Sequence, residues 1–135
     1  MRKLGFLLAV AAFVLLSAGS AIAQEKPDLS KILGAWQVEV YAGDQTFSLN
    51  LTVTEESGRL AGKISESLGT FTDVAISEIS FDGVSFRFSF ISPTPPDGSS
   101  RTVKADLKLS GDTMGGTLTV PDLDVVVDAR ASRAN

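Results

Sequence analysis

The chain has 135 residues, with 12 basic and 16 acidic side chains and neither cysteine nor histidine. Its net charge of −4, with no cluster of lysines or arginines, argues against nucleic acid as a partner, because that recognition needs local positive charge. The missing residue types exclude disulfides, thiol nucleophiles, imidazole acid–base catalysis and zinc sites built on nitrogen or sulfur ligands. We therefore expect no metal ion and no cofactor.

The N-terminus has the pattern of a secretory signal. Two basic residues precede an apolar run, Leu4–Leu16, and Ala21-Ile22-Ala23 fits the small-x-small cleavage rule. The run is shorter than the ~20 apolar residues of a spanning helix. The sequence thus predicts a cleaved signal peptide over 1–23 and a single domain over 24–135.

Cleavage would change the composition and the location of the protein. The remaining chain would carry a net charge of −6, because the removed segment contains two basic and no acidic residues. No cysteine is present to carry a lipid anchor. We expect an exported, soluble protein, in the periplasm or outside the cell, with no stable membrane insertion after cleavage.

From residue 35 onward the apolar period is two almost throughout, which is typical of half-buried strands. In one example, Phe47, Leu49 and Leu51 alternate with polar residues. Turn residues such as Gly43-Asp44 and Gly111-Asp112 separate the alternating segments. The pattern predicts eight strands, at about 35–42, 45–55, 59–66, 70–80, 84–92, 101–109, 113–120 and 123–131. The long connection, Ser92–Ser100, contains three prolines and is expected to be a stiff surface loop.

Eight antiparallel strands with short links favour an all-β fold, an up-and-down meander closed into a barrel, since closure leaves no unpaired edge. An outer-membrane barrel has the same alternation, but its apolar face points outward to the lipid and its polar face points into the barrel. One tryptophan and one tyrosine are too few for two aromatic girdles, which favours a barrel with an apolar interior.

Gly34-Ala35-Trp36 at the start of the first strand resembles the G-x-W start of lipocalin-like (calycin-type) barrels. It is similar also to small exported bacterial domains with the same start. The resemblance implies an eight-stranded barrel in which an arginine of the last strand packs on the tryptophan, and Arg130 matches that position. The chain departs from lipocalins in being shorter, in having no disulfide and in having no helix after the last strand.

Two glycines and a set of phenylalanines are the candidate binding residues. Large apolar side chains inside a barrel either fill it or line a pocket for one small ligand, and the phenylalanines that supply such area here are Phe47, Phe71, Phe81, Phe86, Phe88 and Phe90. Gly62 and Gly116 stand at apolar-face positions of returning strands, where a glycine marks a bulge, a bend or a close approach, and we favour a bend that helps the sheet close on itself. The candidate lumen residues are Phe47, Leu49, Phe86, Phe88, Phe90, Gly62 and Gly116. The predicted inward faces carry no charge, so a ligand should be mostly apolar.

These observations leave three functions open. The first is an exported binding module for a small apolar ligand in the lumen, or for a protein at the loop end. The second is a filled structural or interaction domain that acts through its loops, notably Ser92–Ser100. The third is an enzyme, which the sequence does not favour because no catalytic constellation is recognisable.

Overall fold

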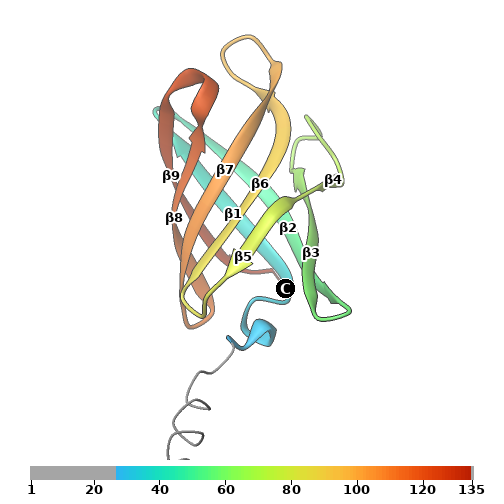
Figure 1. Cartoon of the computed structure of the whole chain (residues 1–135). Helices are drawn as coiled ribbons and strands as arrows, with labels where there is room; N and C mark the ends of the chain where they lie inside the picture. The colour runs from blue at the N-terminus through green and yellow to red at the C-terminus, as the bar shows by residue number, and fades with distance from the viewer. Residues whose placement is uncertain (1–26, 135) are drawn as a thin grey trace, which may run out of the picture.

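The computed structural model describes residues 27–134 as one barrel of strands (Figure 1). The predicted signal peptide lies outside the described residues. Among those residues, no helix combines the length and the hydrophobicity needed to span a bilayer.

Nine antiparallel strands form a single sheet in the order β4-β3-β2-β1-β9-β8-β7-β6-β5. Because β1 pairs with β9, the meander curls into a nearly closed barrel, and the predicted all-β, up-and-down architecture is confirmed. The elements are η1 Leu29–Lys31, β1 Gly34–Ala42, β2 Gln45–Glu56, β3 Arg59–Glu66, β4 Val74–Ala75, β5 Ser77–Phe81, β6 Ser85–Thr94, β7 Ser99–Ser110, β8 Thr113–Val120, η2 Pro121–Leu123 and β9 Val125–Arg133.

The prediction of eight strands is wrong at one place, because the segment expected to be one strand over 70–80 is divided into β4 and β5. β4 pairs with β3, whereas β5 pairs with β6 across a register shift. Asp73 and Glu78 have φ values of 51° and 50°, a conformation that non-glycine residues rarely adopt and that interrupts an extended strand. Between β4 and β5, the backbone N–H of Ile76 donates a hydrogen bond to the Gly62 carbonyl of β3 at 3.1 Å.

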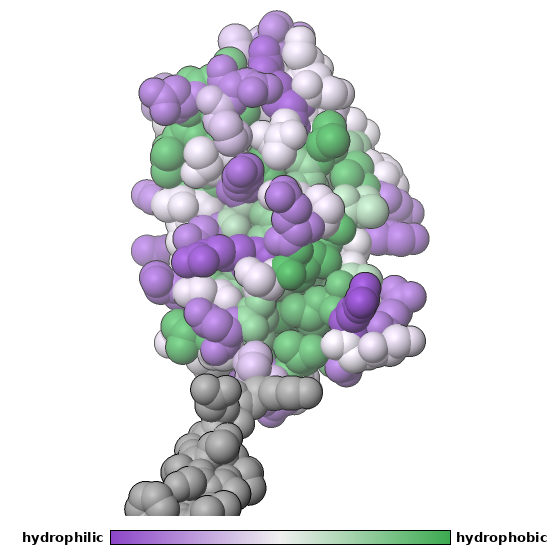
Figure 2. Space-filling model, in the orientation of Figure 1, coloured by the Kyte–Doolittle hydropathy of each residue, from purple (hydrophilic) through white to green (hydrophobic). Residues whose placement is uncertain are grey.

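This break leaves a seam in the wall between β3 and β5. Side chains close it: Ile76 is buried, and Leu60 and Ile79 are half-buried against the core. Figure 2 looks onto this side of the barrel, and apolar surface is visible at the height of the seam. Along β2 the alternation holds, with Leu51 and Val53 buried and the residues beside them exposed, whereas in β6 Ser85 and Ser89 are buried as well.

One end of the barrel is closed by Trp36, which is fully buried. Its indole Nε1 donates a hydrogen bond to the carbonyl of Ile32 at 2.9 Å, which ties the barrel to the short helix η1 in front of β1. Asp28 caps that helix by accepting a hydrogen bond from the Ser30 N–H at 3.1 Å. Both described ends of the chain lie here, at the bottom of Figure 1.

The arginine on Trp36 is Arg133, and the prediction of Arg130 is wrong. The Arg133 guanidinium carbon lies 4.1 Å from the Trp36 ring centroid, in cation–π geometry. Trp36 pairs with Arg133 across β1 and β9, whereas Arg130 lies opposite Glu39 and is exposed. Side chains alternate along a strand, so Arg130 lies on the outer face between the buried residues Ala129 and Ala131.

Arg133 also completes the closed end through the backbone. Its guanidinium donates to the carbonyls of Leu33 and Lys31, the second at 2.6 Å. Gly34 lies beneath it with φ of 110°, and a Cβ there would stand 3.3 Å from an Arg133 nitrogen. The G-x-W start therefore brings one indole, one guanidinium and a left-handed glycine together.

Gly62 and Gly116 occupy equivalent positions in two hairpins, and both mark close approaches. A Cβ on Gly62 would lie 2.5 Å from the Thr52 carbonyl oxygen, and one on Gly116 would lie 2.0 Å from that of Asp106. In each hairpin this oxygen belongs to the residue just before the glycine's cross-strand partner. The glycines thus let neighbouring strands approach each other closely, one of the explanations expected from sequence.

Candidate ligand-binding cavity

The interior is filled near the closed end. Phe81 and Phe86 meet edge to face with centroids 6.4 Å apart, and Phe86, Phe88 and Phe90 follow one another at 5.2 and 6.1 Å along β6. Phe86 and Phe88 are almost fully buried. The phenylalanine rings therefore pack against one another and fill interior space in this half of the barrel.

Toward the opposite end the interior is hollow. A cavity of about 700 Å³ opens there, within the 300–1,000 Å³ range of small-molecule sites. Its wall is predominantly apolar, and most of it is contributed by strand residues and by three of the connections at the top of Figure 1. The lining residues are Val40, Ala42, Gln45, Phe47, Leu49, Glu66, Thr70, Phe71, Phe90, Ser92, Pro93, Thr94, Pro95, Pro96, Gly98, Val103, Leu118, Val120, Leu123, Val125 and Val127.

The candidate residues from the sequence divide between the two halves. Phe47, Leu49 and Phe90 line the cavity. The other four candidates, Phe86, Phe88, Gly62 and Gly116, are not among its lining residues. Sequence alternation identifies the inward face of a strand but not how far along the barrel each residue lies. The barrel has both a filled part and a cavity, the two arrangements that the sequence left open.

Phe71 belongs to the predicted phenylalanine set but is a cavity residue omitted from the candidate lumen residues. It lies in the connection between β3 and β4, and its ring centroid is 5.9 Å from that of Phe90. The connection is tied to the barrel by a hydrogen bond from the Glu66 N–H to the Phe71 carbonyl and another from the Ser67 N–H to the Ser48 carbonyl. The connection therefore forms part of the cavity wall beyond the end of β3.

Glu66 is the second omission, and it corrects the expectation that the inward faces carry no charge. The side chain is only 7% exposed and lines the cavity. Its Oε2 accepts from the Leu68 N–H at 3.0 Å and its Oε1 from the Thr70 N–H at 3.1 Å. Hydrogen bonding from Thr70, followed by that from Leu68, lowers the pKa of Glu66, so the carboxylate is ionised at neutral pH. The period-two pattern of β3, in which Ile64 is inward, would have identified it.

The loop predicted over Ser92–Ser100 is shorter than expected. β6 continues to Thr94 and β7 begins at Ser99, so only Pro95–Gly98 connects them. Pro93 is tolerated in the strand because β6 pairs with β5 only as far as Ser89, which leaves one side of β6 without a ladder partner.

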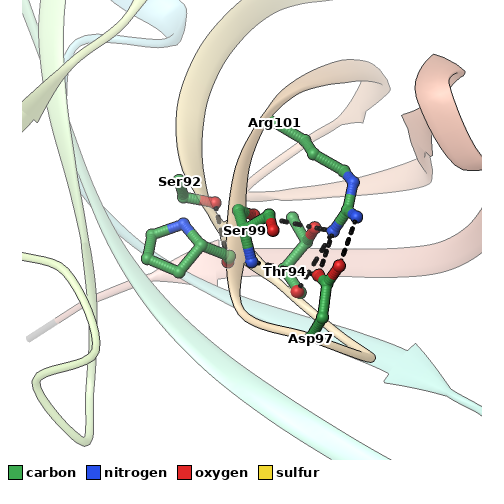
Figure 3. Close-up of polar contacts among 6 residues, drawn as sticks. Ser92, Thr94, Asp97, Ser99 and Arg101 are labelled. Atoms are coloured by element: carbon green, nitrogen blue, oxygen red, sulfur yellow. Dashed lines mark hydrogen bonds and ion pairs between the residues drawn. The ribbon is translucent and has the colours of Figure 1, made fainter.

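Arg101 and Asp97 form an ion pair across this connection (Figure 3). The guanidinium binds both carboxylate oxygens of Asp97, at 2.9 and 3.0 Å, and donates to the Thr94 hydroxyl at 2.8 Å. The Gly98 N–H donates to the Thr94 carbonyl at 2.9 Å, which closes the turn. The arrangement keeps Pro95 and Pro96 at the mouth of the cavity.

The Asp97 carboxyl should resist protonation. Bidentate binding by Arg101, and then the Ser99 N–H, hold the pKa of Asp97 well below its ordinary value. A carboxyl whose folded pKa is lowered stabilises the fold above its unfolded pKa, and that stabilisation is lost only as the pH falls through the folded value. In an NMR titration, the Asp97 Cγ shift should stay at its ionised value below pH ~3.9, the ordinary midpoint. Arg101→Gln should return the midpoint toward that value, and a wild-type midpoint near it would contradict the paired geometry.

The carboxylates of the described residues form neither a three-ligand metal site nor a pair on the cavity wall. No group of three or more Asp, Glu, His or Cys within residues 27–134 is placed to hold a metal ion. Glu66 is the one carboxylate among the described lining residues, whereas glycosidase-type acid–base catalysis uses two. The absence of enzymatic activity stays a prediction.

No protein-family model matches the chain. Comparisons with curated proteins and with solved structures gave no match either. Function is therefore inferred from the cavity itself.

Proposed function

We propose that the protein is a binding module that holds a small apolar molecule in the cavity at the open end of the barrel. The observation that carries this proposal is a wall of about twenty predominantly apolar residues around about 700 Å³, above a floor of packed phenylalanines. Binding there would remove apolar surface of both ligand and wall from water, the main source of affinity in such sites.

The proposal includes two further expectations from the sequence. Export to the periplasm or beyond rests on residues 1–23 alone and stays a prediction. A lipocalin-like relationship is supported by Gly34-Ala35-Trp36 and by the guanidinium on the indole, although Arg133 rather than Arg130 supplies it. The alternative, an interaction domain acting through its loops, is less favoured because Pro95, Pro96 and Gly98 line the cavity.

Two neighbouring valines of β9 provide a matched test of the site. Val127 lines the cavity, whereas Val126 points outward and is 61% exposed. Val127→Trp would place an indole in the cavity and should weaken binding of N-phenyl-1-naphthylamine, a neutral fluorescent probe, at least about tenfold, which corresponds to ~1.4 kcal/mol. Val126→Trp makes the same change on the outer face and should leave the affinity unchanged.

Fluorescence titration gives both affinities, and thermal melts confirm that each variant is folded. Equal affinities in folded variants would show that the probe binds outside the cavity. Failure of the wild-type protein to bind the probe, together with no ligand retained in native mass spectra of protein purified from its host, would reject the proposed function.

A further inference from the structure

The charge on the cavity wall is negative. Among the described residues that line it, Glu66 is an ionised carboxylate and none is lysine or arginine. The hydroxyls beside it are partly engaged: Thr94 donates to the Ser99 carbonyl at 3.4 Å, and Ser92 donates to the Pro93 carbonyl at 3.3 Å. Glu66 is therefore the one charged side chain among the described residues that line the cavity, beside the uncharged polar side chains of Gln45, Ser92 and two threonines, and its charge is negative.

Glu66 retains the capacity to bind a ligand. Each carboxylate oxygen accepts one backbone N–H, the Thr70 side chain also hydrogen-bonds to the group, and a carboxylate offers about four lone-pair sites in all. Because the two amide donors hold it in place, binding would require little ordering of its side chain. Apolar surroundings strengthen an interaction between this carboxylate and a positive group, whereas they make an approaching anion unfavourable.

The rim of the cavity has the same sign. The four connections at the open end contain five aspartates and no lysine or arginine: Asp44, Asp73, Asp97, Asp122 and Asp124. Arg101, the cation beside them on β7, is bound to Asp97. A mouth of one sign attracts ligands of the opposite sign and raises their rate of association, an effect that salt screens.

We propose that the ligand is a cationic amphiphile, an apolar chain or ring system ending in a protonated amine, with its cation against Glu66. This inference rests on the proposed function, since it names the chemistry of the molecule that the cavity takes. The proposal predicts that fatty acids bind poorly, because their carboxylate would be repelled by Glu66 and by the acidic rim.

Three ligands of one chain length test the inference: dodecylamine, dodecanol and dodecanoate, titrated calorimetrically below the micelle concentrations of the amine and the carboxylate and below the solubility limit of the alcohol. The amine should bind about tenfold or more tightly than the alcohol, the factor expected for one charge-assisted hydrogen bond, and dodecanoate should bind most weakly. The advantage of the amine over the alcohol should shrink in Glu66→Gln and at high salt.

Matched variants separate the site from general attraction to an acidic protein. Asp112→Asn removes an acid from the closed end and should leave the preference for the amine over the alcohol unchanged. Val127→Trp should lower the affinity for the amine. Alcohol or dodecanoate binding as tightly as the amine in the wild-type protein would overturn the cationic preference and leave the apolar cavity standing. An amine affinity that Val127→Trp leaves unchanged would also overturn it. If neither the neutral probe nor any of the three ligands binds, the proposed function itself fails.

Discussion

Replacing Trp36 with alanine should lower the free energy of unfolding by about 3–5 kcal/mol, as large truncations in protein cores do. The indole is fully buried, donates a hydrogen bond to Ile32 and is covered by Arg133. Its removal would leave a void at the closed end and would also leave the Ile32 carbonyl without this donor. Urea unfolding followed by circular dichroism measures the loss, and a variant as stable as wild type would contradict this role of the indole.

Two arginines of β9 provide the control for this arrangement. Arg133→Ala should cost about 2 kcal/mol, because it removes the cation–π contact and charged donors to two carbonyls. Arg130→Ala, an exposed position on the same strand, should change stability by less than about 0.5 kcal/mol. A reversed order of the two effects would favour the arrangement first expected from the resemblance to lipocalins.

Gly116→Ala should be the second strongly destabilising change, at about 3 kcal/mol, the upper part of the usual range for overpacking. The new Cβ would lie 2.0 Å from the Asp106 carbonyl oxygen, and that oxygen belongs to the backbone. No side-chain rotation relieves such a contact, so β7 and β8 would have to separate locally. Urea unfolding should show the loss as a lower midpoint.

The neighbouring glycine offers a control within one strand. A Cβ on Gly115 would meet no atom within 4 Å, so Gly115→Ala should be close to neutral or slightly stabilising, because alanine restricts the unfolded chain more than glycine does. Equal effects of the two substitutions would show that loss of glycine flexibility matters, and the close approach does not.

These predictions concern the closed end and the wall, whereas the binding predictions concern the open end. The two ends differ because Trp36, Phe81, Phe86 and Phe88 fill the lower interior, and the residues around the upper one, such as Val103 and Leu118, leave a cavity. Substitutions in the lower part should therefore change stability first, and substitutions of lining residues such as Val127 should change binding first.

Much of the fold follows from the sequence. Period-two alternation identifies the two faces of each strand, and turn residues locate most of the links, so seven of the eight predicted ranges each match one observed strand to within about two residues. The exception, 70–80, contains two left-handed non-glycine residues, Asp73 and Glu78, which no local pattern announces. The same alternation, continued to the end of β9, predicts that Arg130 lies on the outer face and Arg133 on the inner face.

The site is less accessible from sequence than the fold. Phe47, Leu49 and Phe90 were predicted as lumen residues and line the cavity, but Phe86 has the same alternation as Phe90 and lies in the filled half. Phe71 stands in a connection, where periodicity carries no information about what it contacts.

The sequence by itself determined an all-β meander with one apolar face and the position of most turns. Both follow from local pattern, because strand period and turn chemistry depend on neighbouring residues, whereas the packing of an arginine on Trp36 was implied only by the resemblance to lipocalins. Only the tertiary structure decided that the interior is filled at one end and hollow at the other, that Glu66 lies on the cavity wall and that Arg133 covers the indole. Those outcomes depend on the register between β1 and β9 and on how far the connection after β3 folds over the barrel, both of which join residues distant in the sequence.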